Sequence, residues 1–272
     1  VGSEMCIRDS VTGATGQIGN AVYTRLAQQT DRYDVWALDR SPTFSARVPP
    51  SWTLDIPADR LHLCDLTDLD GLRQAVRGMD VVAHLAADPS PRDWESVLQS
   101  NLIGAYNAFE ACRLEGVPRI VVASSITLGD GFVEDEPYRA IREKRYADVP
   151  RPIPTIGIDV PARPRTLYAA SKVWAESLAR VYAHRHGLSC LVIRIGQVER
   201  DRPRPPNGAS IFVSVRDIVQ IWERCINAPE ALRFDVFWGM SNNDWRWVDI
   251  DHAREVLGFE PEDRAEDNWD YG

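Results

Sequence analysis

A tyrosine and a lysine stand four residues apart in the stretch from Tyr168 to Lys172. On a helix this spacing puts both side chains on one face. A free tyrosine titrates near pH 10, so making it a base at neutral pH needs about 4 kcal/mol of stabilisation of the phenolate. A neighbouring ammonium group is a natural source of that stabilisation. The pair predicts a general base, although on its own such a pair is commonplace on helix surfaces.

A glycine-rich segment from Thr12 to Gly19 makes this prediction more specific. Gly13 allows a tight turn, Gly16 lets the backbone approach a pyrophosphate, and Gly19 allows close packing of a helix on a strand. The helix that follows would offer free N–H groups and a partial positive charge to the phosphates. The segment therefore predicts a dinucleotide-binding loop.

An acidic residue follows this loop at the expected distance. Asp39 comes directly after the predicted strand 33–38, twenty residues after Gly19, where a carboxylate can bind the adenosine ribose hydroxyls. Such a carboxylate would repel a 2′-phosphate, which favours NAD over NADP. Arg40 could pair with that phosphate, but a solvated surface side chain is the simpler interpretation.

An alternating series of strands and helices has to bring these residues together. The sequence predicts strands at 33–38, 61–64, 81–85, 120–123, 191–195 and 234–238, and helices at 18–29, 67–76 (capped by Thr67), 93–115, 167–185, 215–227 and 250–257. Short strands separated by helices imply a parallel sheet with right-handed crossovers. We therefore expect an α/β fold, a doubly wound parallel sheet of the Rossmann type over 11–195, with a small C-terminal substrate-binding region at 196–272.

The first strand of this sheet has an unexpected sequence. Arg8, Asp9 and Ser10 occupy the place of a buried apolar strand, and charged groups are seldom fully buried without partners. We interpret residues 1–10 as a non-native segment, similar to adapter read-through in environmental sequence data. The alternative is a frayed, poorly formed first strand.

Two segments interrupt the alternation of strands and helices. Residues 130–165 are charged and rich in proline, and insertions of this length are usually lids, binding loops or disordered. Residues 199–207 form a second loop rich in arginine and proline.

Composition excludes several classes of protein. A net charge of −9 argues against a nucleic-acid partner, which would need clustered Lys and Arg. The five cysteines form no C-x-x-C pair, so neither a disulfide scaffold nor a metal site is expected. No apolar run approaches a membrane span, and no signal peptide is visible. We expect a cytoplasmic protein that has no membrane partner.

The motifs together resemble those of the extended short-chain dehydrogenases/reductases, the NAD-dependent epimerase/dehydratase family. They are Thr12 to Gly19, Asp39, Asp65, His84 to Ala87, Asn101, Ser124-Ser125, Tyr168 and Lys172, and they span essentially the whole chain after residue 10. The resemblance implies that Tyr168 is the general base and that Lys172 binds the nicotinamide ribose and lowers the tyrosine pKa. It also implies that Ser125 orients the reacting hydroxyl and that Asn101 supports the site from the long helix.

The cofactor is expected to be NAD, with NADP less favoured. The cofactor-binding residues expected from the glycine loop and from the resemblance are Gly13, Thr15, Gly16, Gln17, Ile18, Asp39, Arg40, Asp65, Leu66, Leu85, Ala86, Ala87, Asn101, Tyr168, Lys172 and Ile195.

Within the family, residues 84–89, 191–196, 237–244 and 253–259 look like the uronate dehydrogenase branch, which also contains NAD-dependent enzymes that oxidise glucose 6-phosphate. This resemblance implies oxidation of C1 of a cyclic sugar to a lactone. Tyr168 would remove the anomeric hydroxyl proton while a hydride leaves C1 for the nicotinamide ring.

The chain departs from that branch around the substrate. The serine pair is commonly followed there by Asn-His, but here by Ile126-Thr127, and the serine after residues 194–196 is replaced by Gln197. The usual substrate-clamping arginine has no clear counterpart. Arg200, Arg202 and Arg204 are candidates to bind a carboxylate or phosphate, or they form a solvated loop. The tentative substrate contacts are Ser124, Ile126, Gln197 and Arg204.

Two other functions remain open. A nucleotide-sugar epimerase or dehydratase uses the same Tyr and Lys and keeps its NAD bound, although the roughly 75 residues after Gly196 look small for holding a nucleotide. A non-catalytic NAD-binding sensor is the second alternative. The resemblance also implies a homodimer formed through the helices at 93–115 and 167–185.

Overall fold

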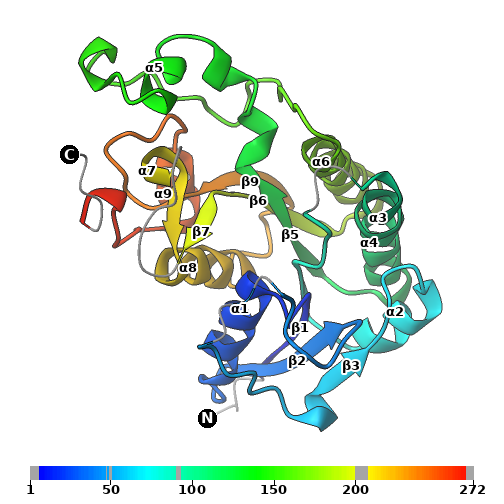
Figure 1. Cartoon of the computed structure of the whole chain (residues 1–272). Coiled ribbons are helices and arrows are strands. Elements are labelled where there is room, and N and C mark those ends of the chain that lie inside the picture. The colour runs from blue at the N-terminus through cyan, green and yellow to red at the C-terminus, as the bar shows by residue number, and fades with distance from the viewer. Residues whose placement is uncertain (1–5, 47, 49–50, 90–92, 200–207, 268–272) are drawn as a thin grey trace.

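A seven-stranded parallel sheet forms the centre of the molecule (Figure 1). The computed structural model describes residues 6–46, 48, 51–89, 93–199 and 208–267. The strands of the sheet are β1 (Ile7–Thr12), β2 (Tyr33–Asp39), β3 (Leu61–Leu63), β4 (Val81–His84), β5 (Arg119–Ser125), β6 (Ser189–Ile195) and β9 (Phe234–Gly239). Their order is β3-β2-β1-β4-β5-β6-β9. This order confirms the predicted doubly wound fold, since the first six strands follow the dinucleotide-binding arrangement.

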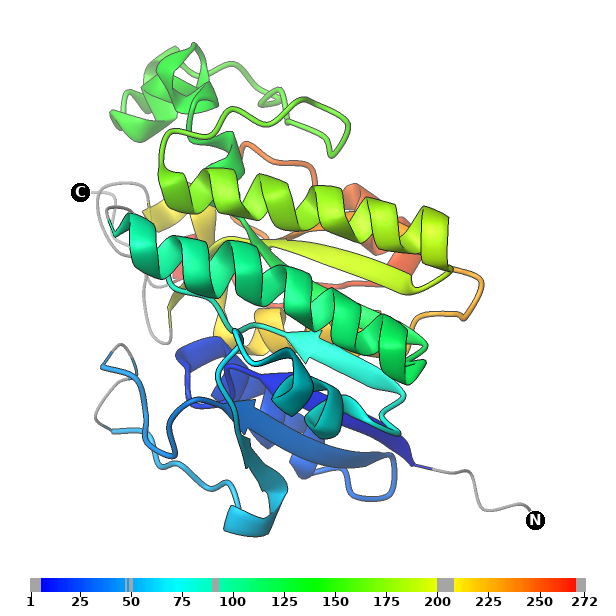
Figure 2. The same cartoon turned by 90° about the vertical axis from the view of Figure 1, so that its right-hand side faces the viewer.

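Helices cover both faces of the sheet (Figures 1 and 2). On one face lie α1 (Gln17–Ala27) and α8 (Val215–Ile226), and on the other α2 (Leu69–Val76), α4 (Gly104–Glu115) and α6 (Leu167–His186). β4, β5 and β6 supply side chains alternately to two cores, as Val121 and Val122 of β5 illustrate. Both faces are buried, which explains the continuous apolar strands.

The long helix expected over 93–115 is divided into three parts. α3 (Trp94–Val97) passes into a π-helical turn (Leu98–Ile103) and then into α4. Such turns are rare and often lie at functional sites. The cap of α2 also differs from the prediction, because the carboxylate of Asp68 accepts from Gly71 N at 3.0 Å, while Thr67 donates to Asp65.

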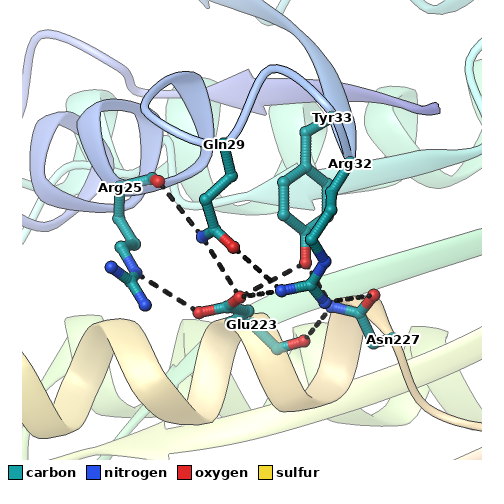
Figure 3. Close-up of polar contacts among 6 residues, drawn as sticks. All are labelled: Arg25, Gln29, Arg32, Tyr33, Glu223 and Asn227. Carbon is teal, nitrogen blue, oxygen red and sulfur yellow. Dashed lines mark hydrogen bonds and ion pairs between the residues drawn. The ribbon is translucent and has the colours of Figure 1, made fainter.

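Besides their shared apolar core, α1 and α8 are connected by one acidic side chain, Glu223 of α8 (Figure 3). Its carboxylate accepts hydrogen bonds from four side chains at the end of α1 and the start of β2, which are Arg25, Gln29, Arg32 and Tyr33. The contact joins segments almost 200 residues apart in sequence.

The first strand is paired along its whole length. β1 pairs with β2 from Ile7 to Thr12 and with β4 from Asp9 onward, so the structure does not show the frayed strand considered above. Asp9 and Ser10 are fully buried, and neither carboxylate oxygen of Asp9 nor the Ser10 hydroxyl has a hydrogen-bond partner. The non-native origin of residues 1–10 stays a prediction, and residues 1–5 lie outside the described residues.

The insertion at 130–165 is folded. It contains α5 (Tyr138–Arg142) and short 3-10 turns at Phe132–Glu134 and Tyr146–Asp148, and a further 3-10 turn at Ile126–Gly129 leads into it. Its apolar side chains share a third core with the C-terminal part of the chain, formed by Ile126, Ala140, Ile141, Val149, Ile156, Trp238, Met240, Trp247, Val248 and Ile250. Ile156 N donates to the Trp247 carbonyl at 2.9 Å, which fastens the insertion to this part of the chain.

The region after residue 195 contributes both to the central sheet and to the third core. β9 extends the central sheet and α8 covers one of its faces. Its remaining elements are a small sheet of β7 (Gln197–Glu199) and β8 (Phe212–Ser214), the short helix α7 (Gly208–Ile211), α9 (Asp251–Leu257) and a 3-10 turn at Ala265–Asp267. Elsewhere in the chain, a 3-10 turn at Ala58–Arg60 precedes β3. No helix within the described ranges is both long and apolar enough to cross a membrane.

Candidate active site

A pocket of about 510 Å³ opens where β1, β2, β4 and β5 end and α6 begins. Carboxyl ends of parallel strands are the usual place for ligands in this fold. Its lining includes the residues predicted from sequence as Gly13, Thr15, Gly16, Gln17, Ile18, Asp39, Arg40, Asp65, Leu66, Leu85, Ala86, Ala87, Ser124, Ser125, Tyr168, Lys172 and Ile195. A second groove of about 660 Å³ between α1 and α8 contains none of them.

The glycine loop forms a cradle that side chains would fill. Gly13 has a φ of 72°, and a Cβ there would lie 2.8 Å from Ala86 N. A Cβ at Gly19 would come within 2.1 Å of the Gly13 carbonyl oxygen, so only glycine lets α1 pack so closely on the loop. Gly16 is the N-cap of α1 and supplies no side-chain cap. The first N–H groups of α1 therefore suit a pyrophosphate, and the cradle fits a dinucleotide.

Two carboxylates line the pocket at the end of β2 and after β3, where the sequence predicts the adenosine of the dinucleotide. Asp39 accepts from Thr15 N at 3.0 Å and from Arg40 N at 2.8 Å, which orients it toward the loop. Asp65 accepts from the Thr67 N–H at 2.9 Å and from the Thr67 hydroxyl at 2.7 Å. These bonds lower the pKa of Asp65. Asp65 is therefore an ionised acceptor at neutral pH.

A buried threonine–histidine pair lies under the loop. Thr12 Oγ1 is 2.9 Å from His84 Nδ1, and it accepts from Leu85 N and Ala86 N at 3.2 Å each. Burial, and secondarily the charge of Lys172, lowers the pKa of His84 to about 3. The imidazole is therefore neutral, and the pair joins the ends of β1 and β4.

The predicted catalytic pair lies at the start of α6. Thr166 caps this helix by accepting from Ala169 N at 3.0 Å, which places Tyr168 in the first turn. Lys172 Nζ lies 5.6 Å from the centre of the Tyr168 ring and donates to the Ala123 carbonyl at 2.8 Å. Burial lowers the pKa of Lys172 to about 8. The sequence predicted both residues, and the structure places them on one wall of the pocket.

Asn101 lies behind this wall and not among the lining residues. It sits in the π-helical turn, where its side chain accepts from Asp88 N at 2.7 Å and donates to the Asp88 carbonyl at 2.8 Å. It also donates to Ser171 Oγ at 3.0 Å, and Ser171 donates to the Tyr168 carbonyl at 2.7 Å. Asn101 therefore connects the loop after β4 with the turn of α6 that carries Tyr168.

The tentative substrate residues are scattered. Ser124 lines the pocket, but Ile126 is buried in the third core, and the Gln197 side chain donates to Glu199 at 3.1 Å, outside the lining. Arg204, like Arg200 and Arg202, lies outside the described residues.

The pocket also contains residues that sequence reasoning missed. Ser45 and Ala46 close it after β2, with Ser45 N donating to the Thr15 carbonyl at 3.1 Å, and Asp88 with Pro89 follows β4. Asp88 stands directly after the 84–87 motif, so its position was a usable signal. The loop carrying Ser45 has no motif. No metal-binding group of three or more His, Cys, Asp or Glu occurs in the part of the chain that the structure describes.

Comparisons with known proteins identify the family of the chain. The family model described as "NAD dependent epimerase/dehydratase family" matches residues 10–251. The NAD-dependent glucose-6-phosphate dehydrogenase of Haloferax volcanii is 32% identical, over 94% of this chain and 93% of its own length. The uronate dehydrogenase of Agrobacterium fabrum is 36% identical, over 94% of this chain and 84% of its own length.

A solved structure of a family member has the same fold as this chain. A point mutant of uronate dehydrogenase from Agrobacterium tumefaciens, complexed with NAD, superposes with a TM-score of 0.76 at 34% identity, covering 97% of this chain and 87% of that one. The chain belongs to the NAD-dependent epimerase/dehydratase family, the extended short-chain dehydrogenases/reductases, and is an NAD-dependent oxidoreductase.

Proposed function

We propose that the protein is a sugar dehydrogenase that oxidises the C1 hydroxyl of a cyclic sugar to a lactone. The observation that carries this proposal is that Tyr168, Lys172 and Ser125 line the same pocket as the dinucleotide cradle. The relatives named above, together with the 27% identical L-arabinose 1-dehydrogenase (NAD(P)(+)) of Haloferax volcanii, support it.

Each of the side chains in the pocket has a separate role in the proposed reaction. Oxidation of a C1 hydroxyl removes a hydride from carbon and a proton from oxygen, and NAD when bound accepts the hydride. Tyr168 takes the proton, and the nearby charge of Lys172 stabilises the phenolate that this requires. Ser125 holds the substrate oxygen as it becomes the carbonyl oxygen of the lactone. Asp39 favours NAD over NADP, because its carboxylate would repel a 2′-phosphate.

The substrate is a uronate, an aldose or a sugar phosphate. The charged side chains among the described lining residues are those of Asp39, Arg40, Asp65, Asp88 and Lys172. Because Arg40 adjoins Asp39 and the proposed mechanism assigns Lys172 to Tyr168, an anionic sugar would take its cation from the arginine-rich segment 200–204.

The decisive test is formation of NADH with a panel of aldoses, uronates and sugar phosphates, with NAD and NADP offered separately. We expect turnover with NAD that is abolished in Tyr168→Phe, because the phenol is the proton acceptor. Arg204→Ala is expected to raise KM for an anionic sugar and leave a neutral one unaffected. NAD binding without turnover of any sugar would contradict the proposal.

The same assay separates the alternatives. GDP-mannose 3,5-epimerase 1 of Oryza sativa is 26% identical over 71% of this chain but only 47% of its own length. An epimerase interconverts sugars with no net NADH, and a sensor shows no turnover. Stoichiometric NADH therefore excludes both.

We further propose that the protein is a homodimer formed by α4 and α6. These helices lie side by side on one surface (Figure 2). They and the adjoining helical turns expose large apolar side chains, which are Trp94, Ile103, Tyr106, Leu114, Leu167, Trp174 and Val181. Three of these recur every seven residues along α6, as in helices that pack against partner helices.

A further inference from the structure

Two adjacent serines end β5 in the pocket, and their hydroxyls are bonded in opposite ways. Ser124 Oγ donates to Glu176 Oε1 at 2.6 Å. Arg194 holds that carboxylate through two bonds of 2.9 Å each. Glu176 and Arg194 are nearly buried, so this acceptor is fixed. The single proton of Ser124 is therefore committed to Glu176 and is not free for a ligand.

Ser125 has the opposite arrangement. Its Oγ accepts from the Thr127 backbone N–H at 3.2 Å and from the Thr127 hydroxyl at 3.0 Å. A hydroxyl has two acceptor lone pairs and one proton. Both lone pairs of Ser125 are used by Thr127, so its proton is left to point elsewhere. Because Ser125 lines the pocket, that proton can be donated to a ligand there.

We propose that Thr127 is a positioning residue that fixes Ser125 as a hydrogen-bond donor to the reacting oxygen of the substrate. The inference rests on the dehydrogenase function proposed above. When Tyr168 takes the substrate proton, negative charge develops on that oxygen, and a donor hydroxyl stabilises it. A serine free to rotate would instead accept from the substrate hydroxyl for part of the time, which favours the reactant. Ser125 keeps its own proton throughout, and the transferred proton goes to Tyr168.

The hydroxyl of Thr127 can be removed with little structural disturbance. Thr127 is half-exposed in the 3-10 turn that follows β5, and its hydroxyl donates to Ser125. Its backbone N–H makes a separate bond that survives substitution of the side chain. Thr127→Val keeps the branched shape and removes the hydroxyl, and Thr127→Ser keeps the hydroxyl. Thr24→Val, at a half-exposed position of α1, is a matched control.

The first measurement is steady-state kinetics with the best sugar. We expect Thr127→Val to lower kcat about tenfold, because the loss of one hydrogen bond in the transition state slows a reaction by about this factor. KM for the sugar, the affinity for NADH and the thermal midpoint should change little, because the bond matters when charge develops. Thr127→Ser should restore kcat to within about twofold of wild type. An unchanged kcat, a rise confined to KM, or a Ser variant no better than Val would overturn the inference.

The second measurement is neutron diffraction from a crystal exchanged into heavy water, and it needs no turnover. We expect the Thr127 deuteron on Ser125 Oγ and the Ser125 deuteron directed into the pocket. A Ser125 deuteron on Thr127 Oγ1 would overturn the inference even if the enzyme is a dehydrogenase. A wild-type protein inactive with every sugar would refute the proposed function instead, while the deuteron positions still decide this one.

Discussion

Lys172 is a buried lysine whose charge the proposed mechanism uses to stabilise the Tyr168 phenolate. It is one of only two lysines among the 31 basic residues, the other being Lys144. Arginine would stay charged at any accessible pH, whereas a buried lysine titrates in reach of neutrality. Labelling the lysine Cε carbons with ¹³C should give two NMR signals, which Lys144→Arg assigns. We expect the Lys172 signal to titrate at about pH 8. A midpoint above about pH 10 would show that burial does not control this residue.

The buried charge of Lys172 should cost stability. Its folded-state pKa is lowered from 10.5 to about 8, so between these values the unfolded chain binds more protons, and this cost shrinks as pH rises. We expect Lys172→Met to raise the free energy of unfolding by about 1–3 kcal/mol near neutrality, less any loss of the bond to Ala123. Denaturant unfolding as a function of pH measures this. Lys144→Met is the exposed control, and a destabilised Lys172→Met at neutral pH would contradict the prediction.

Asp39 is the residue expected to choose the cofactor. Asp39→Asn keeps an acceptor for Thr15 N but removes the negative charge. We expect KM for NAD to rise roughly tenfold and the preference for NAD over NADP to fall, because the 2′-phosphate is no longer repelled. Kinetics with both cofactors test this, with Asp31→Asn on the surface as control. An unchanged preference would assign the choice to another residue.

At the scale of elements, β1 differs from the other strands of the sheet in carrying a buried carboxylate, that of Asp9, with no hydrogen-bond partner. Burial, and secondarily Asp80, raises the pKa of Asp9. A raised folded-state pKa favours folding at low pH, and that contribution is lost as pH rises. We expect Asp9→Val to raise the free energy of unfolding by about 2 kcal/mol or more, and the gain should grow from about pH 5 to about pH 8. Denaturant unfolding at both values checks this, with exposed Asp31→Ala as control. If Asp9→Val raised the free energy of unfolding by the same amount at both pH values, ionisation of the buried Asp9 carboxylate would not be the cause.

The π-helical turn is a second instance in which an element serves the site. It brings Asn101 to bond with both Asp88 and Ser171. Helical periodicity alone predicts an unbroken helix over these residues, since a π turn changes the spacing by a single residue. The turn is decided by what Asn101 meets on other elements.

At the scale of the whole molecule, the exposed apolar surface of α4 and α6 predicts association. Val181→Glu puts a charge into this surface and should convert the dimer to a monomer, because burying an unpaired charge costs more than such an interface can supply. Light scattering after size exclusion measures the mass. Leu63→Glu, on an equally exposed apolar residue of β3, should leave the dimer intact. A wild-type monomer at every concentration would contradict the proposal.

The third core makes the insertion part of the scaffold. The side chains of Trp238 and Trp247 lie in a cluster with residues of the insertion, so α5 is joined to the end of the central sheet. Composition had suggested a lid, binding loop or disordered segment, because proline and charge dominate at 130–165. Several of the apolar residues there are buried, namely Ala140, Ile141, Val149 and Ile156, and their partners lie about 100 residues further along the chain.

The sequence by itself predicted most strands of the central sheet and the long helices between them, the dinucleotide loop and the Tyr168–Lys172 pair. These are local features: periodicity places elements to within a few residues, and a glycine or a four-residue spacing has its meaning within one turn. The family followed from the same motifs.

Tertiary structure decided which of two neighbouring serines donates to Glu176, that Ile126 is buried in the third core, and that Asn101 bonds to Asp88 and Ser171. The partners that decide these points, such as Glu176 for Ser124, come from elements distant in sequence. Hydrogen bonds and burial depend on which atoms come into contact in the folded chain. A single sequence, analysed one segment at a time, does not give those contacts.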